Sequence, residues 1–272
     1  AIGGSLSLAG AILQGIYRNP LVEPYTLGIS GGASLGVTFA IVVGLHLLNI
    51  LFLPLAGFIG AFVTIFFVYT LSIRKGALSV NRMLLIGVMV SFISSSMMMF
   101  LMSITAVENI HGIVFWIMGS LNESNTAMIR GMVSLSIVCL IIAYIFVMPL
   151  NALRLGEEKA RHLGINSDIS IRILFVITSL LTGACIAVAG IIGFVGLVVP
   201  HIVRLWVGSD YRIMLIASFL SGGTFLIVCD VLARTVISPN ELPIGVITGI
   251  VGGIAFIILL SRSQKQSKLL KG

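Results

Sequence analysis

The stretch FLPLAGFIGAFVTIFFVYTLSI, at residues 52–73, carries no charged side chain and is long enough to cross a bilayer as one helix. A helix needs about 20 apolar residues to span the hydrocarbon core. The rest of the chain has the same character, since 58% of its residues are hydrophobic and only 9% are charged. A soluble domain has about 25% charged residues. The composition therefore excludes a water-soluble protein and predicts an all-α, polytopic transmembrane protein.

Outward from this stretch, the apolar segments predict nine crossings in a single transmembrane domain that covers residues 1–272. A short crossing is expected at 194–207, and the still shorter stretch 113–120 is expected at a membrane interface. The three cysteines sit inside apolar stretches and are predicted to be buried thiols. The long crossings are expected at 1–17, 27–48, 52–73, 83–104, 127–149, 169–192, 213–236 and 242–261.

The basic residues predict the orientation, because Lys and Arg are retained on the cytoplasmic side of a membrane. With the C-terminus inside, alternation of the spans leaves only Arg130 and Arg234 outside. The net charge of +7 is then explained by membrane orientation, and no nucleic-acid partner is expected. The fourteen basic residues predicted to lie inside are Arg18, Arg74, Lys75, Arg82, Arg154, Lys159, Arg161, Arg172, Arg204, Arg212, Arg262, Lys265, Lys268 and Lys271.

The longest polar segment, 151–170, lies on the inner side in this topology. Its sequence ALRLGEEKARHLGINS has charges at helical spacing between Gly156 and Gly164. Glycine commonly ends a helix, so a short cytoplasmic helix bounded by two turns is predicted. A charged segment can equally be a solvated connector, and the sequence pattern leaves both interpretations open.

Two prolines suggest an internal repeat. Pro20 and Pro200 end the similar segments AGAILQGIYRNP (9–20) and AGIIGFVGLVVP (189–200). Proline inside a span removes a backbone hydrogen bond and breaks or kinks the helix. Broken helices in corresponding places are typical of transporters built from repeats, so two oppositely running copies with breaks at these prolines are predicted.

The chain carries no energy-converting motif of its own. It has neither the phosphate-binding GxxxxGK[ST] motif nor HExxH, so energy must come from a partner or from an ion gradient. Ion-coupled carriers usually hold acidic residues in mid-membrane. Asp230 is the nearest candidate, but Arg234 follows one helical turn later and can neutralise it. An ion-coupled secondary carrier therefore remains the alternative to a transporter driven by a partner.

A GxSxG pattern at residues 28–32 raises the possibility of a serine hydrolase with Ser30 as nucleophile. Such a serine needs a base within hydrogen-bond reach. His201 is the one histidine near a predicted span, and nothing in the sequence orients it. Small residues at this position more simply allow close helix packing, so the chain is not expected to be an enzyme.

Four segments, in order along nearly the whole chain, resemble the FecCD-type permeases of ABC importers for iron-siderophores, heme and cobalamin. They are QGIYRNPLVEPYTLGISGGASLG (14–36), LNALRLGEEKARHLGI (150–165), AGIIGFVGLVVPHIVRLWVGSDYR (189–212) and DVLARTVISPNELPIGVITGIVGG (230–253). The resemblance implies a ten-helix permease in the plasma (inner) membrane of a prokaryote. The first helix is then expected to be absent from this chain, because nine spans ending inside place Ala1 outside.

The resemblance also implies partners. These are a second permease subunit, identical or different, two cytoplasmic ATPase subunits and an extracytoplasmic substrate-binding protein, with membrane lipid around the helices. ATP and Mg are expected on the ATPase and no cofactor in this chain.

Three groups of site residues follow from the resemblance. Residues about 151–168 are expected to couple to the ATPase, and Arg234 to pair with an acidic residue of the binding protein. The translocation path is expected along 83–104 and 194–204, where flexible methionines suit a large ligand, although a methionine run can also pack a core or face lipid. The coupling residues are Leu155, Gly156, Glu157, Glu158, Ala160, Arg161, Leu163 and Gly164, and the path residues are Ser91, Ser95, Met98, Val199 and Pro200.

Overall fold

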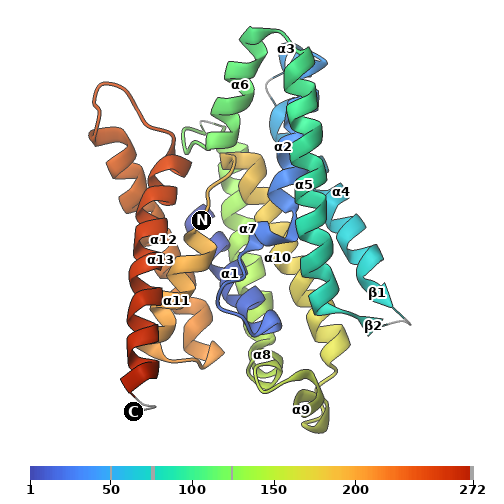
Figure 1. Cartoon of the computed structure of the whole chain (residues 1–272), viewed down its shortest axis with the longest axis vertical. Helices are drawn as coiled ribbons and strands as arrows, with labels where there is room; N and C mark the ends of the chain where they lie inside the picture. The colour runs from blue at the N-terminus through green and yellow to red at the C-terminus, as the bar shows by residue number, and fades with distance from the viewer. Residues whose placement is uncertain (50, 75–76, 124, 270–272) are drawn as a thin grey trace.

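The computed structural model describes residues 1–49, 51–74, 77–123 and 125–269, and most of them form helices that run along the length of the molecule (Figure 1). One turn of 3-10 helix, η1 (Pro24–Leu27), precedes α2, and two short antiparallel strands, β1 (Ile73–Arg74) and β2 (Ala77–Leu78), follow α4. The α-helices are α1 (Ile2–Tyr17), α2 (Ile29–Val42), α3 (Leu45–Leu48), α4 (Phe52–Ser72), α5 (Val80–Ile104), α6 (Val107–Met118), α7 (Thr126–Ile145), α8 (Val147–Leu153), α9 (Glu157–His162), α10 (Ser167–Ala189), α11 (Val195–Val207), α12 (Tyr211–Thr235) and α13 (Ile244–Leu269).

The lengths of these helices confirm the predicted polytopic membrane fold. Among the described residues, α4, α5, α7, α10 and α12 are long and apolar enough to cross a membrane. The helices α1, α2, α6, α11 and the apolar part of α13 are shorter. Two predicted spans are divided: 27–48 turns at Gly44 (φ +81°) between α2 and α3, and 127–149 is interrupted at Phe146 between α7 and α8.

The helix α1 lies at the centre of the bundle, where it packs against α10, α11 and α12. Every residue from Gly3 to Ile16 is buried. The close packing depends on glycine, because a Cβ on Gly10 would overlap the carbonyl of Gly196 and a Cβ on Gly3 would overlap that of Gly222. Helices in a bilayer associate through such small residues, since lipid provides no hydrophobic driving force between them.

The GxSxG segment also serves helix packing. It forms the start of α2, where a Cβ on Gly32 would overlap Thr64 of α4 and a Cβ on Gly31 would lie 3.2 Å from the Cα of Ser91 on α5. The predicted packing role of these small residues is confirmed. The cysteines Cys139, Cys185 and Cys229 are free and buried, as expected.

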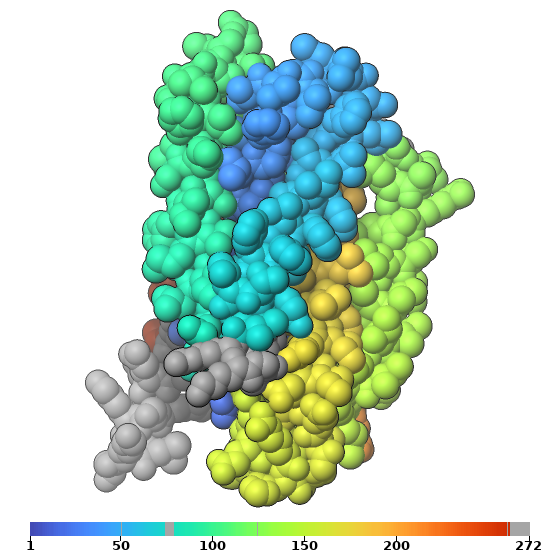
Figure 2. All heavy atoms as spheres, turned by 90° about the vertical axis from the view of Figure 1, so that its right-hand side faces the viewer, coloured from blue at the N-terminus to red at the C-terminus, as the bar shows by residue number. Residues whose placement is uncertain are grey.

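Figure 2 shows the face on which α4 lies between α5 and α10, and these helices expose many large apolar side chains. Phe62, Phe66 and Phe92 expose 61%, 57% and 67% of their surfaces. A water-soluble protein rarely exposes a continuous apolar surface of this kind, whereas lipid tails are suited to it.

The prediction that Pro20 and Pro200 break helices in corresponding places is wrong. The helix α1 already ends at Tyr17, with Arg18 in the left-handed conformation (φ +51°), so Pro20 lies in a loop. Pro200 lies inside α11 without ending it. The break in the second segment comes earlier, at 190–194, between Gly190 (φ +70°) and Phe194 (φ +67°).

Candidate translocation path and coupling segment

A short helix projects from one end of the bundle (Figure 1). This is α9, which begins after Gly156 (φ +113°) and is followed by a turn at Gly164 (φ +81°), so the predicted helix between two glycine turns is confirmed. The backbone N–H of Ile165 donates to the carbonyl of Ala160 (3.0 Å) and that of Gly164 to Arg161 (2.9 Å). This pattern ends a helix when the residue beyond it is left-handed, which favours glycine.

The predicted coupling residues divide into an anchored and an exposed set. Gly156 and Ala160 are buried, and the hydroxyl of Ser167 donates to the Glu157 carbonyl (3.3 Å). Leu155 and Leu163 expose 59% and 63% of their surfaces. Glu158 and Arg161 are also exposed, and Gly164 lies in open space. We define residues 155–164 as the coupling segment, an anchored helix that presents two leucines among charged side chains.

The coupling segment is connected to the bundle through α8. The side chain of Asn151 donates to the carboxylate of Asp210 (2.8 Å) and accepts from the backbone N–H of Tyr211 (3.1 Å). The guanidinium of Arg154 donates to the carbonyl of Ser209. These bonds attach the end of α8 to the turn that joins α11 to α12.

Asp210 is the charged centre of this attachment. Its carboxylate accepts from the backbone N–H of Arg212 (3.0 Å) and caps the start of α12. This bond, and the amide of Asn151, hold the pKa of Asp210 below its usual range. The carboxylate is therefore ionised at neutral pH, as the attachment requires.

Two irregular segments meet level with the middle of α1. Tyr25 of η1 accepts, through its hydroxyl, the backbone N–H of Ile192 in the break before α11 (3.1 Å). A Cβ on Gly196 would lie 2.7 Å from Pro24 and 2.9 Å from the carbonyl of Leu6 in α1. The segment that connects α1 to α2 thus lies inside the bundle. Non-helical backbone at this depth is tolerated only where protein or a cavity surrounds it.

Glu23 lies at the same level and was missed by sequence reasoning. It stands at the start of η1, and its carboxylate faces the backbone N–H of Phe194, at the N-terminus of α11. A carboxylate deep in a helical bundle marks a functional position more often than a structural one. The depth of Glu23 could not be predicted, because residues 18–26 lie between two predicted spans and have the pattern of an ordinary loop.

The path residues predicted on α5 share one partly exposed side of that helix. Ser91, Ser95 and Met98 are half-buried, and the Ser91 hydroxyl donates to its own helix at Gly87 (3.1 Å). Beside them is an open depression of about 540 Å³ lined by Leu35, Phe92, Ile93, Ser96, Met97 and Phe100.

Val199 and Pro200 lie apart from this side of α5. Both are buried in α11, which packs against α1, α12 and α13, whereas α5 packs against α2, α4 and η1. The structure therefore does not bring the two predicted groups of path residues together within one chain.

Arg234 belongs to an exposed polar cluster at the end of the bundle opposite the coupling segment. Its guanidinium pairs with Asp230 (2.9 Å) and Glu241 (3.6 Å) and donates to Asn122 (2.6 Å). Asn122 in turn donates to Glu241 (2.8 Å). The side chain of Arg234 remains 40% exposed. The local partner Asp230 is therefore present, Glu241 is a second one, and the three charged groups carry a net charge of −1.

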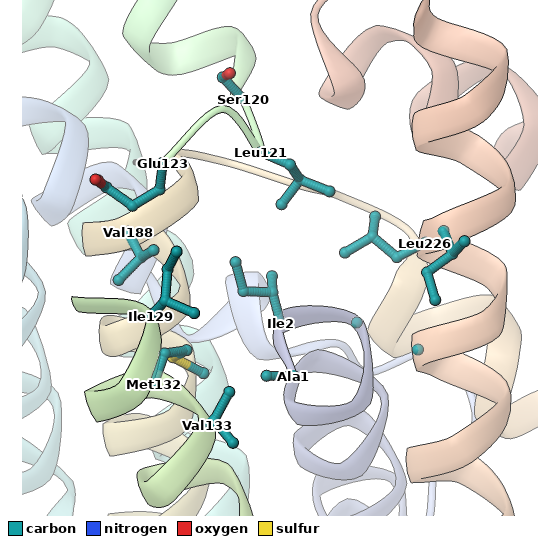
Figure 3. Close-up of a pocket in the computed structure, with 13 residues that line it drawn as sticks. Ala1, Ile2, Ser120, Leu121, Glu123, Ile129, Met132, Val133, Val188 and Leu226 are labelled. Carbon is teal, nitrogen blue, oxygen red and sulfur yellow. The ribbon is translucent and has the colours of Figure 1, made fainter. Parts of the chain in front are cut away.

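A cavity of about 290 Å³ lies near this end, between the start of α1, α7 and α12 (Figure 3). Figure 3 shows Leu121 and Glu123 above it and Ile2, Met132 and Leu226 around it. Pockets that hold drug-sized ligands measure about 300–1,000 Å³, so this cavity does not enclose a large chelate. Among the described residues, no group of three or more His, Cys, Asp or Glu side chains could hold a metal ion.

Comparison with known protein families and structures gives consistent matches. A family model described as the FecCD transport family matches residues 1–262. The hemin transport system permease protein HmuU of Yersinia pestis is 36% identical over 268 residues, which cover 97% of this chain and 80% of that protein. The vitamin B12 import system permease protein BtuC of Klebsiella pneumoniae is 37% identical over 264 residues, covering 97% and 78%.

A solved structure has the same fold. It is an inward-facing conformation of a transporter described as of the metal-chelate ABC type, with a TM-score of 0.87 and 31% sequence identity. The match covers 96% of this chain and 83% of the other.

Proposed function

Because the chain belongs to the FecCD transport family, we propose that it is the membrane permease of an ATP-driven importer for a metal-chelate ligand of the heme, cobalamin or iron-siderophore class. The family consists of translocation components rather than catalysts, and the chain is a multi-pass membrane permease of an ABC system. ATP and Mg then bind to two ATPase subunits and not to this chain. A second permease subunit and an extracytoplasmic binding protein complete the assembly.

The observation that carries the proposal is the coupling segment. Leu155 and Leu163 are exposed on either side of a charged helix that is anchored by buried Ala160, an arrangement suited to insertion into a cleft of a partner. Its connection through Asn151 to the turn between α11 and α12 supplies a route from an ATPase to the membrane helices. Movement transmitted along this route would open the translocation path alternately to the two sides of the membrane.

The ligand class is supported by the relatives. The relatives named above move hemin and vitamin B12, both large metal chelates. A cavity of about 290 Å³ is too small for such a ligand. A second permease subunit facing the exposed side of α5 would complete the path, with Ser95 and Met98 beside it.

The orientation follows from the same assignment. An ATPase is cytoplasmic, so the coupling segment and the C-terminus lie inside, in agreement with the Lys and Arg distribution. The cluster of Arg234, Asp230 and Glu241 then lies outside, where an acidic residue of a binding protein could reach the exposed guanidinium.

The test is transport by the purified assembly. The permease is co-expressed with its ATPase and binding protein, reconstituted in proteoliposomes, and assayed with hemin, cyanocobalamin and ferrichrome as separate probes. We expect uptake of one probe with ATP and Mg and no uptake with an ion gradient alone. Uptake driven by the gradient, or failure to co-purify with an ATPase, would overturn the proposal.

One observation favours the alternative, an ion-coupled secondary carrier. Glu23 is an acidic residue level with the middle of α1, facing the N-terminus of α11. In such a carrier, Glu23→Gln would abolish gradient-driven uptake and leave the carrier folded. In the ATP-driven importer, the same variant retains the requirement for ATP.

A further inference from the structure

Pro200 leaves a carbonyl without its helical partner. In a regular helix the carbonyl of Gly196 would accept the backbone N–H of residue 200, but proline has no N–H. Both residues lie inside α11 and are buried. An unpaired backbone carbonyl in the membrane interior is costly, so another donor is needed at this point.

The side chain of Gln14 supplies that donor from the neighbouring helix α1. Its Nε2 donates to the carbonyls of Gly196 (3.3 Å) and Leu197 (3.2 Å), which lie 182 and 183 residues away along the chain. Gln14 is 2% exposed. It therefore makes the bond that Pro200 cannot make, in a place where water does not compete.

The other end of the amide is fixed by Arg204, near the far end of α11. The guanidinium donates to Oε1 of Gln14 (3.4 Å). Arginine has only donors and carbonyls only accept, so the amide has one orientation that satisfies both. A single side chain of α1 thus binds α11 on both sides of Pro200.

These contacts continue the route from the coupling segment. Asn151 holds the backbone of Tyr211, and the hydroxyl of Tyr211 donates to the carbonyl of Ala11 in α1 (3.2 Å). Ala11 lies one turn from Gln14 on α1. At the other end of α11, the break at Ile192 is held by Tyr25.

We propose that Gln14 is a positioning residue that replaces the hydrogen bond missing at Pro200, so that α1 and both halves of α11 move together when the coupling segment moves. Without it, the part of α11 before Pro200 is free to lag behind the part attached to α12. The segment 190–194 would then no longer follow the ATPase. The inference rests on the proposed function, because it assigns Gln14 a part in the transport cycle.

A thiol in the segment 190–194 reports on this movement without requiring the ligand. A Cβ at Gly193 would meet no atom within 4 Å, and the native cysteines are buried. Gly193→Cys is introduced into the permease–ATPase complex in nanodiscs. The rate of modification by N-ethylmaleimide is measured with ADP and with ATP, Mg and vanadate, and ATP hydrolysis is recorded in parallel.

We expect the nucleotide to change the modification rate in the otherwise unaltered complex. Gln14→Leu should reduce this nucleotide-dependent ratio by roughly fivefold, the effect of about 1 kcal/mol for one hydrogen bond. Gln14→Glu keeps the size and the acceptor for Arg204 but, ionised beside it, cannot donate to Gly196. Gln14→Glu should therefore reduce the ratio as Gln14→Leu does, and it replaces Gln14→Leu in the experiment if that variant does not assemble with the ATPase.

The deciding variant is the double substitution Gln14→Leu with Pro200→Ala. Alanine returns an N–H to position 200, so the carbonyl of Gly196 regains a partner within α11. The nucleotide-dependent ratio of the double variant should then lie within a factor of about two of the ratio of the Pro200→Ala single variant. The effects of the two substitutions would thus not add, and the difference from additivity measures the coupling between Gln14 and Pro200.

Two results would overturn the inference alone: an unchanged ratio in both Gln14 variants, or a loss that Pro200→Ala does not restore. A lost packing contact could not be repaired by a backbone N–H, so the second result would assign Gln14 to packing. If the unaltered complex shows no nucleotide-dependent change at all, the proposed function itself fails, and the inference fails with it.

Discussion

Gly164 provides the sharpest test of the coupling segment, because its substitution isolates a single physical effect. Its φ is +81°, and an added Cβ would meet no atom within 4 Å. Gly164→Ala therefore introduces no clash and only places an L-residue in the left-handed region, which costs about 1–2 kcal/mol. The turn after α9 should open roughly five to thirty times more often.

The matched control is Gly131→Ala. Gly131 lies in α7, and its added Cβ also meets no atom within 4 Å, but its backbone is helical. There alanine should stabilise by about 0.5–1 kcal/mol. The same chemical change is thus expected to have opposite signs at the two positions.

The assay is amide hydrogen exchange of the peptide that contains Ile165, whose N–H bonds to Ala160 across the turn (3.0 Å), together with uptake per ATP hydrolysed. Gly164→Ala should speed exchange and reduce uptake per ATP while the yield of folded permease stays constant. Gly164→Pro should do so more strongly, since it also removes the N–H that bonds to Arg161 (2.9 Å). If Gly164→Ala behaves like Gly131→Ala, the turn does not transmit motion and the reasoning is refuted.

Three further predictions follow from the same structure. A cysteine at Lys159 should be labelled by a membrane-impermeant maleimide only in inside-out vesicles; labelling in sealed cells would reverse the orientation. Arg234→Glu should weaken docking of the binding protein by roughly 2–5 kcal/mol if the pair is desolvated on docking, and Glu241→Gln should strengthen docking by freeing the guanidinium. Both affinities are measured by surface binding at two salt concentrations. Lower stability of Arg234→Glu with unchanged docking would make Arg234 purely structural. The pKa of Asp210 lies below its usual range in the folded protein, so its ionised carboxylate stabilises the fold at any pH above the unfolded-state pKa of about 3.9. This stabilisation is lost as the pH falls through the folded-state pKa, and the temperature of unfolding should therefore drop in acid in a way that Asp210→Asn removes. An identical pH profile in that variant would contradict the assignment.

Apolar length and glycine position predicted much of the architecture. The runs at 52–73 and 83–104 became α4 and α5 nearly residue for residue, because a bilayer requires long uncharged helices and few other patterns satisfy it. Gly156 and Gly164 marked the ends of α9 because left-handed turns favour glycine. These are local signals, complete within one turn or one span.

The interior of the site could not be predicted in the same way. Gln14 reads as one polar residue in an apolar span, and its role depends on Gly196, whose contact is 182 residues distant. Pro200 was expected to break α11, but the helix continues because that distant amide replaces the missing donor. Glu23 and Tyr25 belong to a predicted loop but lie in the bundle interior of the structure, where Pro24 packs on Gly196 and Tyr25 accepts the N–H of Ile192.

The shortness of the central helices has a consequence for biogenesis. With 14 and 13 residues, α2 and α11 extend about 20 Å, less than the roughly 30 Å of the hydrocarbon core. The remaining depth is crossed by non-helical backbone, which lipid does not tolerate. Neither helix can therefore be released singly from the insertion machinery into lipid. The glycines of α1 pack against Gly196 and Gly222, which the ribosome adds about 200 residues later, so α1 reaches its final neighbours long after it has been synthesised.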